Sequence, residues 1–264
     1  MQKVAVIGWG NVGYHLSLEL SRQSIDTYVV CRNYHSERHT SEDEKNLHLV
    51  NSFAELPNNI ETIFLTVKDD QIATVASRLP KKMIQNASVL HSSGILPANH
   101  LKGVVPNYGI FYPLNSFSRD QDFHWAGVPV FIESGQERVS RFLHKVAEGA
   151  GARPVKNDDL MREHLHLAAV FANNFTNHLL ALASDMLNKR DIPFDYLHPL
   201  IQTTVEKALR MDPAKAQTGP AIRGDKATLQ KHLSKLEDED LKTLYRQLSR
   251  SIQKLSTDES DKEL

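Results

Sequence analysis

Val4-Ala-Val-Ile-Gly-Trp-Gly-Asn-Val-Gly13, near the start of the chain, joins two different patterns. Val4–Ile7 is a short apolar, β-branched run, and Asn11–Gln23 places apolar residues at helical spacing. A G-x-G-x-x-G motif between a strand and a helix favours dinucleotide binding, because its glycines permit a tight turn and close approach of the pyrophosphate. The alternative is a glycine-rich turn that binds nothing. The motif comprises Gly8, Trp9, Gly10, Asn11, Val12 and Gly13.

The same alternation continues through the first half of the chain. Apolar runs typical of buried strands are separated by helical segments, and no strand pattern recurs after residue 157. This alternation predicts a parallel sheet covered on both faces, with ligands at the carboxyl ends of the strands. We therefore predict a Rossmann-like, doubly wound α/β domain over residues 1–157. The expected strands are Val4–Ile7, Thr27–Cys31, Ile63–Val67, Ser88–His91, Val128–Ile132 and Arg153–Lys156.

Residues 158–264 are expected to form an all-α domain. Asp158 or Asp159 suits the N-cap of a long helix that ends near Lys189. The middle of this helix is apolar on most sides, so we expect it to be largely buried. Three more helices are expected, at about Phe194–Met211, Asp225–Leu236 and Asp238–Leu255.

Composition excludes several classes of function. The 264 residues include 31 Lys and Arg against 32 Asp and Glu, a balance that argues against a nucleic-acid partner. The single cysteine, Cys31, excludes an intrachain disulfide and fits a reducing compartment. No apolar run suits a secretory signal or a membrane span, so we expect a cytoplasmic protein without membrane contact. The 13 histidines show no metal-ligand spacing, so no metal site is predicted.

The end of the second expected strand indicates which dinucleotide binds. An NAD enzyme places an acidic residue there for the ribose 2′-hydroxyl, whereas this chain has Arg32 and Asn33. Arg32 suits a 2′-phosphate, so NADP is predicted over NAD; the alternative is a solvated surface arginine. Val67 and Lys68, at another strand end, are expected beside the dinucleotide. One of the two aspartates that follow them is expected to cap the next helix.

His91-Ser92-Ser93-Gly94 follows a further strand, at the edge where substrate and the reactive end of the cofactor would meet. His91 and Ser93 are candidate catalytic residues there, and Ser92 is a candidate for substrate binding. The alternative is a serine-rich turn with a hydrogen-bonded histidine. The segment Tyr108–Ser118, aromatic and polar by turns, is expected either to line this pocket or to belong to the core.

The long helix carries polar residues among its apolar ones. His166 is a second acid/base candidate, Asn174 is expected to hydrogen-bond the reacting group, and Asn177 to contact substrate. The alternative is hydrogen bonding between helices or across a wet dimer interface. Arg223 lies in a loop with glycine and proline and suits a carboxylate or phosphate of the substrate.

The chain resembles a family of NADP-dependent oxidoreductases that pairs a Rossmann-like domain with a helical C-terminal domain of unknown function. The resemblance rests on GWGNVG, LTVKDDQI, VLHSSG, FYPLNSFS, HLAAVFANNFTNHLLALA and QTGPAIRGD. In architecture the family is similar to pyrroline-5-carboxylate reductase, ketopantoate reductase and the 3-hydroxyacid dehydrogenases. The resemblance implies that the C-terminal helices build a substrate pocket and a homodimer.

The resemblance also implies hydride transfer between NADP and a small, carboxylated carbonyl/hydroxy or imine/amine substrate. One departure affects the chemistry: ketopantoate reductase and the hydroxyacid dehydrogenases use a lysine four residues before an asparagine of the long helix. This chain has Ala169 and Val170 at the matching positions. Imine reduction depends less on such a lysine than carbonyl reduction does. The missing lysine motivates an alternative, a non-catalytic NADP-binding sensor or partner-binding protein.

Overall fold

The computed structural model describes residues 2–31 and 45–260, with side chains as far as residue 255. Two compact units make up the chain, Met1–His178 and Leu179–Leu264. The division into units falls inside the long helical segment, whereas the last strand ends at Lys156. The domain boundary near residue 157 stays a prediction.

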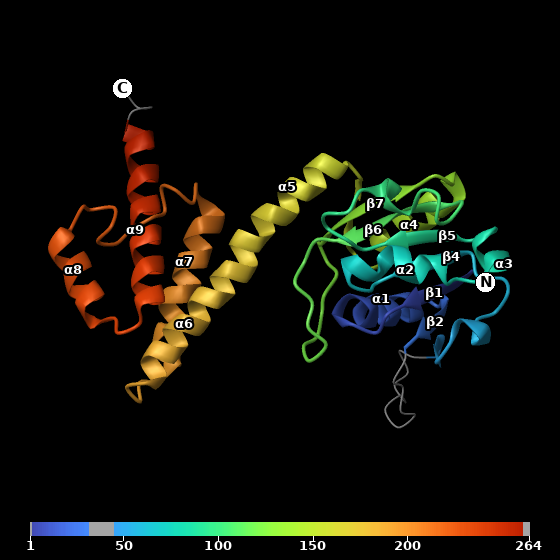
Figure 1. Cartoon of the computed structure of the whole chain (residues 1–264), viewed down its shortest axis with the longest axis horizontal. Helices are drawn as coiled ribbons and strands as arrows, with labels where there is room; N and C mark the ends of the chain where they lie inside the picture. Colours follow the sequence, from blue (N-terminus) through green and yellow to red (C-terminus); the bar gives the residue numbers. More distant parts are fainter. Residues whose placement is uncertain (1, 32–44, 261–264) are drawn as a thin grey trace. The chain divides into compact units, whose positions relative to one another are not determined.

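The first unit contains one eight-stranded sheet in the order β3-β2-β1-β4-β5-β6-β7-β8 (Figure 1). Its neighbouring strands pair in parallel except β6 and β7, which are antiparallel. The Rossmann-like doubly wound fold is thus confirmed, with one reversed strand that the sequence pattern did not predict. The strands are β1 (Lys3–Ile7), β2 (Asp26–Val30), β3 (Leu47–Val50), β4 (Thr62–Leu65), β5 (Ser88–His91), β6 (Tyr108–Pro113), β7 (Pro129–Ser134) and β8 (Arg153–Lys156).

Helices cover both faces of the sheet, because its central strands are apolar on both sides. Leu16 and Leu20 of α1 (Asn11–Arg22) and Leu143 of α4 (Glu137–Gly149) pack in one buried cluster. The cluster on the other face includes side chains from α2 (Ile72–Ser77) and α3 (Lys81–Ile84), which follow the short 3-10 turn η3 (Asp69–Gln71). Because β1, β2, β4 and β5 pair in parallel, their carboxyl ends lie along the same edge of the sheet.

Two strands, β3 and β6, were not expected from the sequence. β6 contains Gly109 and ends at Pro113, residues that weaken a strand pattern. It is nevertheless a central strand, in which a Cβ on Gly109 would lie 2.0 Å from the carbonyl oxygen of Glu133 on β7.

A nearly continuous helical segment follows the sheet: α5 (Asp159–Ala169), the π-helix η5 (Val170–Phe175) and α6 (Thr176–Asn188). The side chain of Asp158 caps it, accepting a hydrogen bond from the backbone N–H of Met161 at 2.8 Å, so capping by Asp158 is confirmed. The expectation that the middle of this helix is largely buried is wrong for the single chain, in which Leu167 is 59% and Phe171 65% exposed.

The second unit consists of helices, as predicted. It holds most of α6, then η6 (Phe194–Leu197), α7 (His198–Arg210), α8 (Lys226–Lys235) and α9 (Glu239–Ser260). Asp225 caps α8 through its carboxylate, which accepts from the backbone N–H and the hydroxyl of Thr228. Across the described residues, no helix has the length and apolar character that a membrane span requires.

Candidate active site

The glycine-rich turn after β1 is closely packed at two of its three glycines. Gly8 has a φ of +113°, and a Cβ there would lie 2.8 Å from the carbonyl oxygen of Thr66. A Cβ on Gly13 would lie 2.1 Å from the carbonyl oxygen of Gly8. The hydroxyl of Thr66 donates to the Gly8 carbonyl at 3.0 Å and ties the turn to the end of β4. Only glycine fits these two positions.

The middle glycine faces open space. Apart from its own chain neighbours, no heavy atom of the described residues lies within 4 Å of a Cβ built on Gly10, the N-cap residue of α1, and no described side chain caps the helix. The first N–H groups of a helix lack intrahelical partners and carry a partial positive charge, which favours a phosphate. A turn that is crowded on its inner side and open at Gly10 therefore fits the pyrophosphate of a dinucleotide.

A cavity of about 380 Å³ lies beside this turn, at the carboxyl ends of β1 and β2. Trp9 and Val67, both predicted cofactor contacts, line it, whereas Lys68 is exposed at the start of η3. Arg32 and Asn33 lie outside the described residues, so their roles stay predictions. In the part of the chain that the structure describes, the lining residues are Ile7, Gly8, Trp9, Val30, Cys31, Phe53, Val67, Val75 and Arg119.

His91 lies at the end of β5 and is completely buried. Its Nδ1 is 3.3 Å from the backbone N–H of Ser93, from which it accepts, and its Nε2 donates to the Pro97 carbonyl at 3.1 Å. Burial lowers the pKa of His91 to about 4, so the ring is neutral at pH 7. Both ring nitrogens are therefore hydrogen-bonded to the backbone of the turn. This geometry favours a role for His91 in holding the turn together over proton transfer to a substrate.

Ser93 joins two strand ends. Its hydroxyl donates to Asp69 at 2.7 Å and accepts from the backbone N–H groups of Ile95 and Leu96. The expectation that one of the adjacent aspartates caps a helix is wrong, because neither η3 nor α2 has a side-chain cap and Asp69 instead accepts from Ser93. The neighbouring Ser92 has a buried hydroxyl without a hydrogen-bond partner among the described residues.

His166 of α5 packs directly against this turn. A Cβ on Gly94 would lie 2.3 Å from the Nδ1 atom of His166, so a glycine is needed for the approach. The same Nδ1 is 3.0 Å from the hydroxyl of Tyr112 on β6. Burial raises the pKa of Tyr112 to about 12, so its hydroxyl stays protonated at pH 7. The Nε2 of His166 has no partner in the described part of the chain.

A buried arginine holds α5 against the turn. Arg162 is fully buried and donates to the Asp159 carboxylate at 2.7 Å, to the Asn157 side chain and to the Leu96 carbonyl. Asp159 also accepts from the backbone N–H of Ala98 at 3.2 Å. Burial raises the pKa of Asp159, but the hydrogen bonds from Asn157, Arg162 and Ala98 outweigh it and lower the pKa below its usual value. This network connects the helix carrying His166 to the segment after β5.

Tyr112 and Arg162 were not singled out as functional from the sequence. The segment containing Tyr112 was considered as a pocket wall, but its partner His166 is 54 residues away. Arg162 is an ordinary helical arginine by pattern, and no local signal marks it as buried.

The remaining predicted site residues lie on the surface of their units. Asn174 and Asn177 are exposed, and Asn174 belongs to the π-helix η5, a distortion that is frequent at functional sites. Arg223 lies in the second unit, in an exposed loop between two glycines with positive φ. Within the described residues, no cluster of His, Cys, Asp or Glu has a geometry suited to a metal ion.

Comparisons with known proteins agree with this geometry. Residues 3–102 match the NAD binding domain of 6-phosphogluconate dehydrogenase, and residues 128–252 match a domain of unknown function, DUF2520. A solved structure from Bacteroides fragilis, described as an NADP oxidoreductase, is 33% identical and has a TM-score of 0.83. The match covers 96% of this chain and 98% of that one. The chain belongs to the family of this oxidoreductase.

The chain also shares its fold with more distant enzymes. Pyrroline carboxylate reductase from Plasmodium falciparum, solved with NADP, is 12% identical, covers 97% of this chain and 98% of its own, and has a TM-score of 0.58. An imine reductase variant from Myxococcus stipitatus, solved with NAD⁺, is 15% identical, with 95% and 93% coverage and a TM-score of 0.61. These two likenesses concern the fold alone. No curated protein matches the chain.

Proposed function

We propose that the protein is an NADP-dependent oxidoreductase that acts on a small, carboxylated substrate with a carbonyl/hydroxy or imine/amine group. The observation that carries the proposal is the glycine turn, crowded at Gly8 and Gly13 and open at Gly10 beside a cavity. When bound, the nicotinamide supplies or accepts a hydride. Gly10 and the first N–H groups of α1 would hold the pyrophosphate, and Arg32 the 2′-phosphate.

The chain's own acid/base group is His166. In the tautomer that carries its proton on Nε2, the ring accepts a hydrogen bond from the Tyr112 hydroxyl at Nδ1, and Nε2 is left to face a substrate. A histidine in this state donates from Nε2 to a developing oxygen or nitrogen anion, and Tyr112 stabilises the ring. His91 and Ser93 shape the turn on which His166 rests, Ser92 lies beside it, and Asn174, Asn177 and Arg223 are proposed to contact substrate.

Imine reduction is the favoured version of this chemistry. The positions matching the catalytic lysine of ketopantoate reductase are Ala169 and Val170, so the described part of that helix offers no ammonium group there. An imine nitrogen accepts a proton more readily than a carbonyl oxygen does and depends less on a strong donor. A histidine supported by a tyrosine is sufficient for it in our proposal.

The cofactor site is tested by Gly10→Ala. A methyl group there enters the space proposed for the pyrophosphate, and overpacking of this kind costs about 1–3 kcal/mol. We therefore expect the dissociation constant for NADPH, measured by fluorescence titration, to rise about 10- to 100-fold. Thermal unfolding of the free protein should stay unchanged, because among the described residues only the chain neighbours of Gly10 come within 4 Å of the new methyl.

Gly13→Ala is the matched comparison. Its Cβ would lie 2.1 Å from the Gly8 carbonyl oxygen, so this variant should lose thermal stability as well as affinity. A Gly10→Ala protein that binds NADPH as tightly as the wild type contradicts the proposed site.

We also propose that the protein is a homodimer through its C-terminal helices, in the cytoplasm. Large apolar side chains are exposed on each unit, including Leu167 (59%) and Phe171 (65%) in the first and Leu200 (62%) and Leu209 (82%) in the second. Exposed apolar side chains that lie together in a large patch mark a site of protein–protein contact. A second copy of the chain would cover them.

Phe171→Glu tests the dimer. A carboxylate in a buried apolar interface is costly, so we expect the variant to elute as a monomer in size-exclusion chromatography with light scattering. Lys145→Glu, at an exposed position of α4, is the control and should keep the wild-type mass. A monomeric wild type would contradict the proposal.

A further inference from the structure

Arg119 lies on the loop between β6 and β7, yet it reaches the glycine-rich turn. Its guanidinium Nη1 donates to the Trp9 carbonyl at 3.2 Å, although the two residues are 110 positions apart. The guanidinium carbon also lies 4.8 Å from the centre of the Tyr14 ring and 5.5 Å from that of Trp9. These contacts hold the cation beside the first turn of α1.

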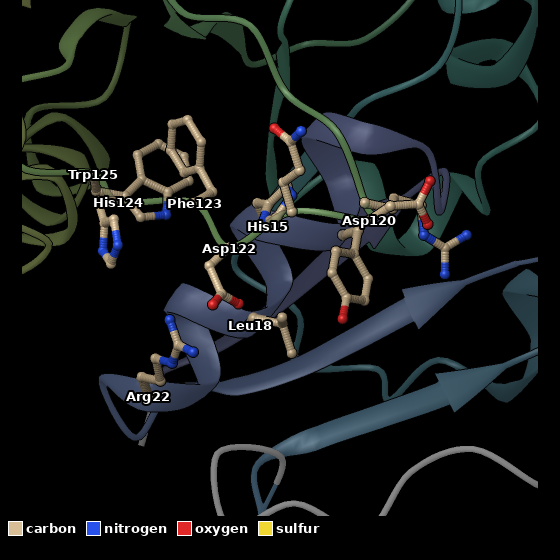
Figure 2. A pocket seen from close by; sticks show the side chains of 11 residues that line it. His15, Leu18, Arg22, Asp120, Asp122, Phe123, His124 and Trp125 are labelled. Carbon is tan, nitrogen blue, oxygen red and sulfur yellow. The ribbon is translucent and has the colours of Figure 1, made fainter. Parts of the chain in front are cut away.

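The loop that carries Arg119 is itself anchored on α1. The buried His15 of α1 contacts the Ser118 carbonyl through Nε2 at 2.7 Å. The rings of Phe117 and Phe123 pack against each other with a centroid distance of 4.2 Å and an interplanar angle of 31°, next to the buried Trp125. Figure 2 shows the segment Asp120–Trp125 alongside the face of α1 that bears His15 and Leu18, where a second cavity of about 400 Å³ lies. Packing of the residues before and after Arg119 in the loop therefore supports its position.

Arg119 is the only charged side chain among the described residues that line the cavity at the ends of β1 and β2. An arginine has five N–H donors, of which the Trp9 carbonyl takes one. The other donors have no protein partner in the described part of the chain. The charge of Arg119 also opposes the effect of burial, which raises the pKa of Cys31 at the end of β2.

We propose that Arg119 binds a phosphate group of the dinucleotide. A guanidinium fixed at the glycine turn, with unused donors and facing a cavity that lacks any other described charge, suits a phosphate ester, because its planar fork matches the phosphate oxygens. The phosphate is either the pyrophosphate common to NADH and NADPH or the 2′-phosphate of NADPH alone. This inference rests on the proposed function, and it adds a second basic residue to the predicted cofactor contacts, which already include Arg32.

The test compares Arg119→Gln, Arg119→Lys and the control Arg22→Gln, which removes a charge from the last turn of α1. Dissociation constants for NADPH and NADH are measured by fluorescence titration at low and high salt, and circular dichroism checks folding. We expect Arg119→Gln to weaken NADPH binding about 10- to 100-fold and to flatten its salt dependence. Arg119→Lys should lose less, and Arg22→Gln should bind as the wild type does.

NADH distinguishes the two phosphates. An equal loss for NADH and NADPH assigns Arg119 to the pyrophosphate, and a loss for NADPH alone assigns it to the 2′-phosphate. Wild-type affinity of a folded Arg119→Gln protein for both dinucleotides overturns the inference while leaving the proposed function intact. A wild-type protein that binds neither dinucleotide overturns both.

Discussion

His166→Gln is expected to lower turnover about 100- to 10,000-fold, the usual contribution of a positioned acid/base group. Glutamine keeps a polar side chain on α5 but cannot transfer a proton at neutral pH. Turnover is measured as NADPH oxidation by a panel of small 2-oxo acids and cyclic imino acids. Binding of NADPH should change little, because His166 contacts Tyr112 and the Gly94 turn and is not part of the glycine loop.

Two variants make this result specific. Tyr112→Phe removes the hydroxyl that lies 3.0 Å from Nδ1, so we expect a smaller loss of turnover than for His166→Gln. His164→Gln is the matched control, because His164 is exposed and its Nδ1 contacts the Leu160 carbonyl of its own helix. An oxidoreductase that retains full turnover in His166→Gln has a different proton donor. Tight NADPH binding without turnover of any panel compound by the wild type would instead favour a sensor.

Asp159→Ala is expected to destabilise the sheet unit by about 3 kcal/mol, the lower end of the cost of leaving one partner of a buried ion pair alone. Arg162 is fully buried, and Asp159, whose side chain is 43% exposed, is its carboxylate partner. The lower end applies because water reaches Asp159 in part. The free energy of unfolding is measured in urea at pH 7. Asp158→Ala, which removes only the N-cap, should cost about 1 kcal/mol.

The same network gives a direction of pH dependence. The pKa of Asp159 is lowered in the folded protein. The ionised carboxylate therefore makes its full contribution to the free energy of unfolding at pH values above the pKa of an unfolded carboxyl, about 4. This contribution is lost as the pH falls through the lower folded value. Wild-type stability should therefore fall more steeply than that of Asp159→Ala below pH 4. Equal slopes for the two proteins would contradict a role for the ionised carboxylate.

Local patterns were enough to predict most of the fold. The strand before Gly8, the helix after Gly10 and the cap at Asp158 each depend on neighbouring residues, because capping and turn formation act over a few positions. The strand β6 was missed, since its glycine and proline suit a turn locally. Its place in the sheet comes from pairing with β5 and β7.

The assignment of roles within the site needed the tertiary structure. His91 was an acid/base candidate by position, and only the fold shows both of its nitrogens bonded and its pKa lowered by burial. The partners that define His166, Arg162 and Arg119 lie 54, 66 and 110 residues away. By itself the sequence determined a dinucleotide-binding turn, an α/β sheet and a helical C-terminal region, because these follow from short-range geometry. Only tertiary structure decided which side chains meet, because contacts across the sheet depend on strand order and packing.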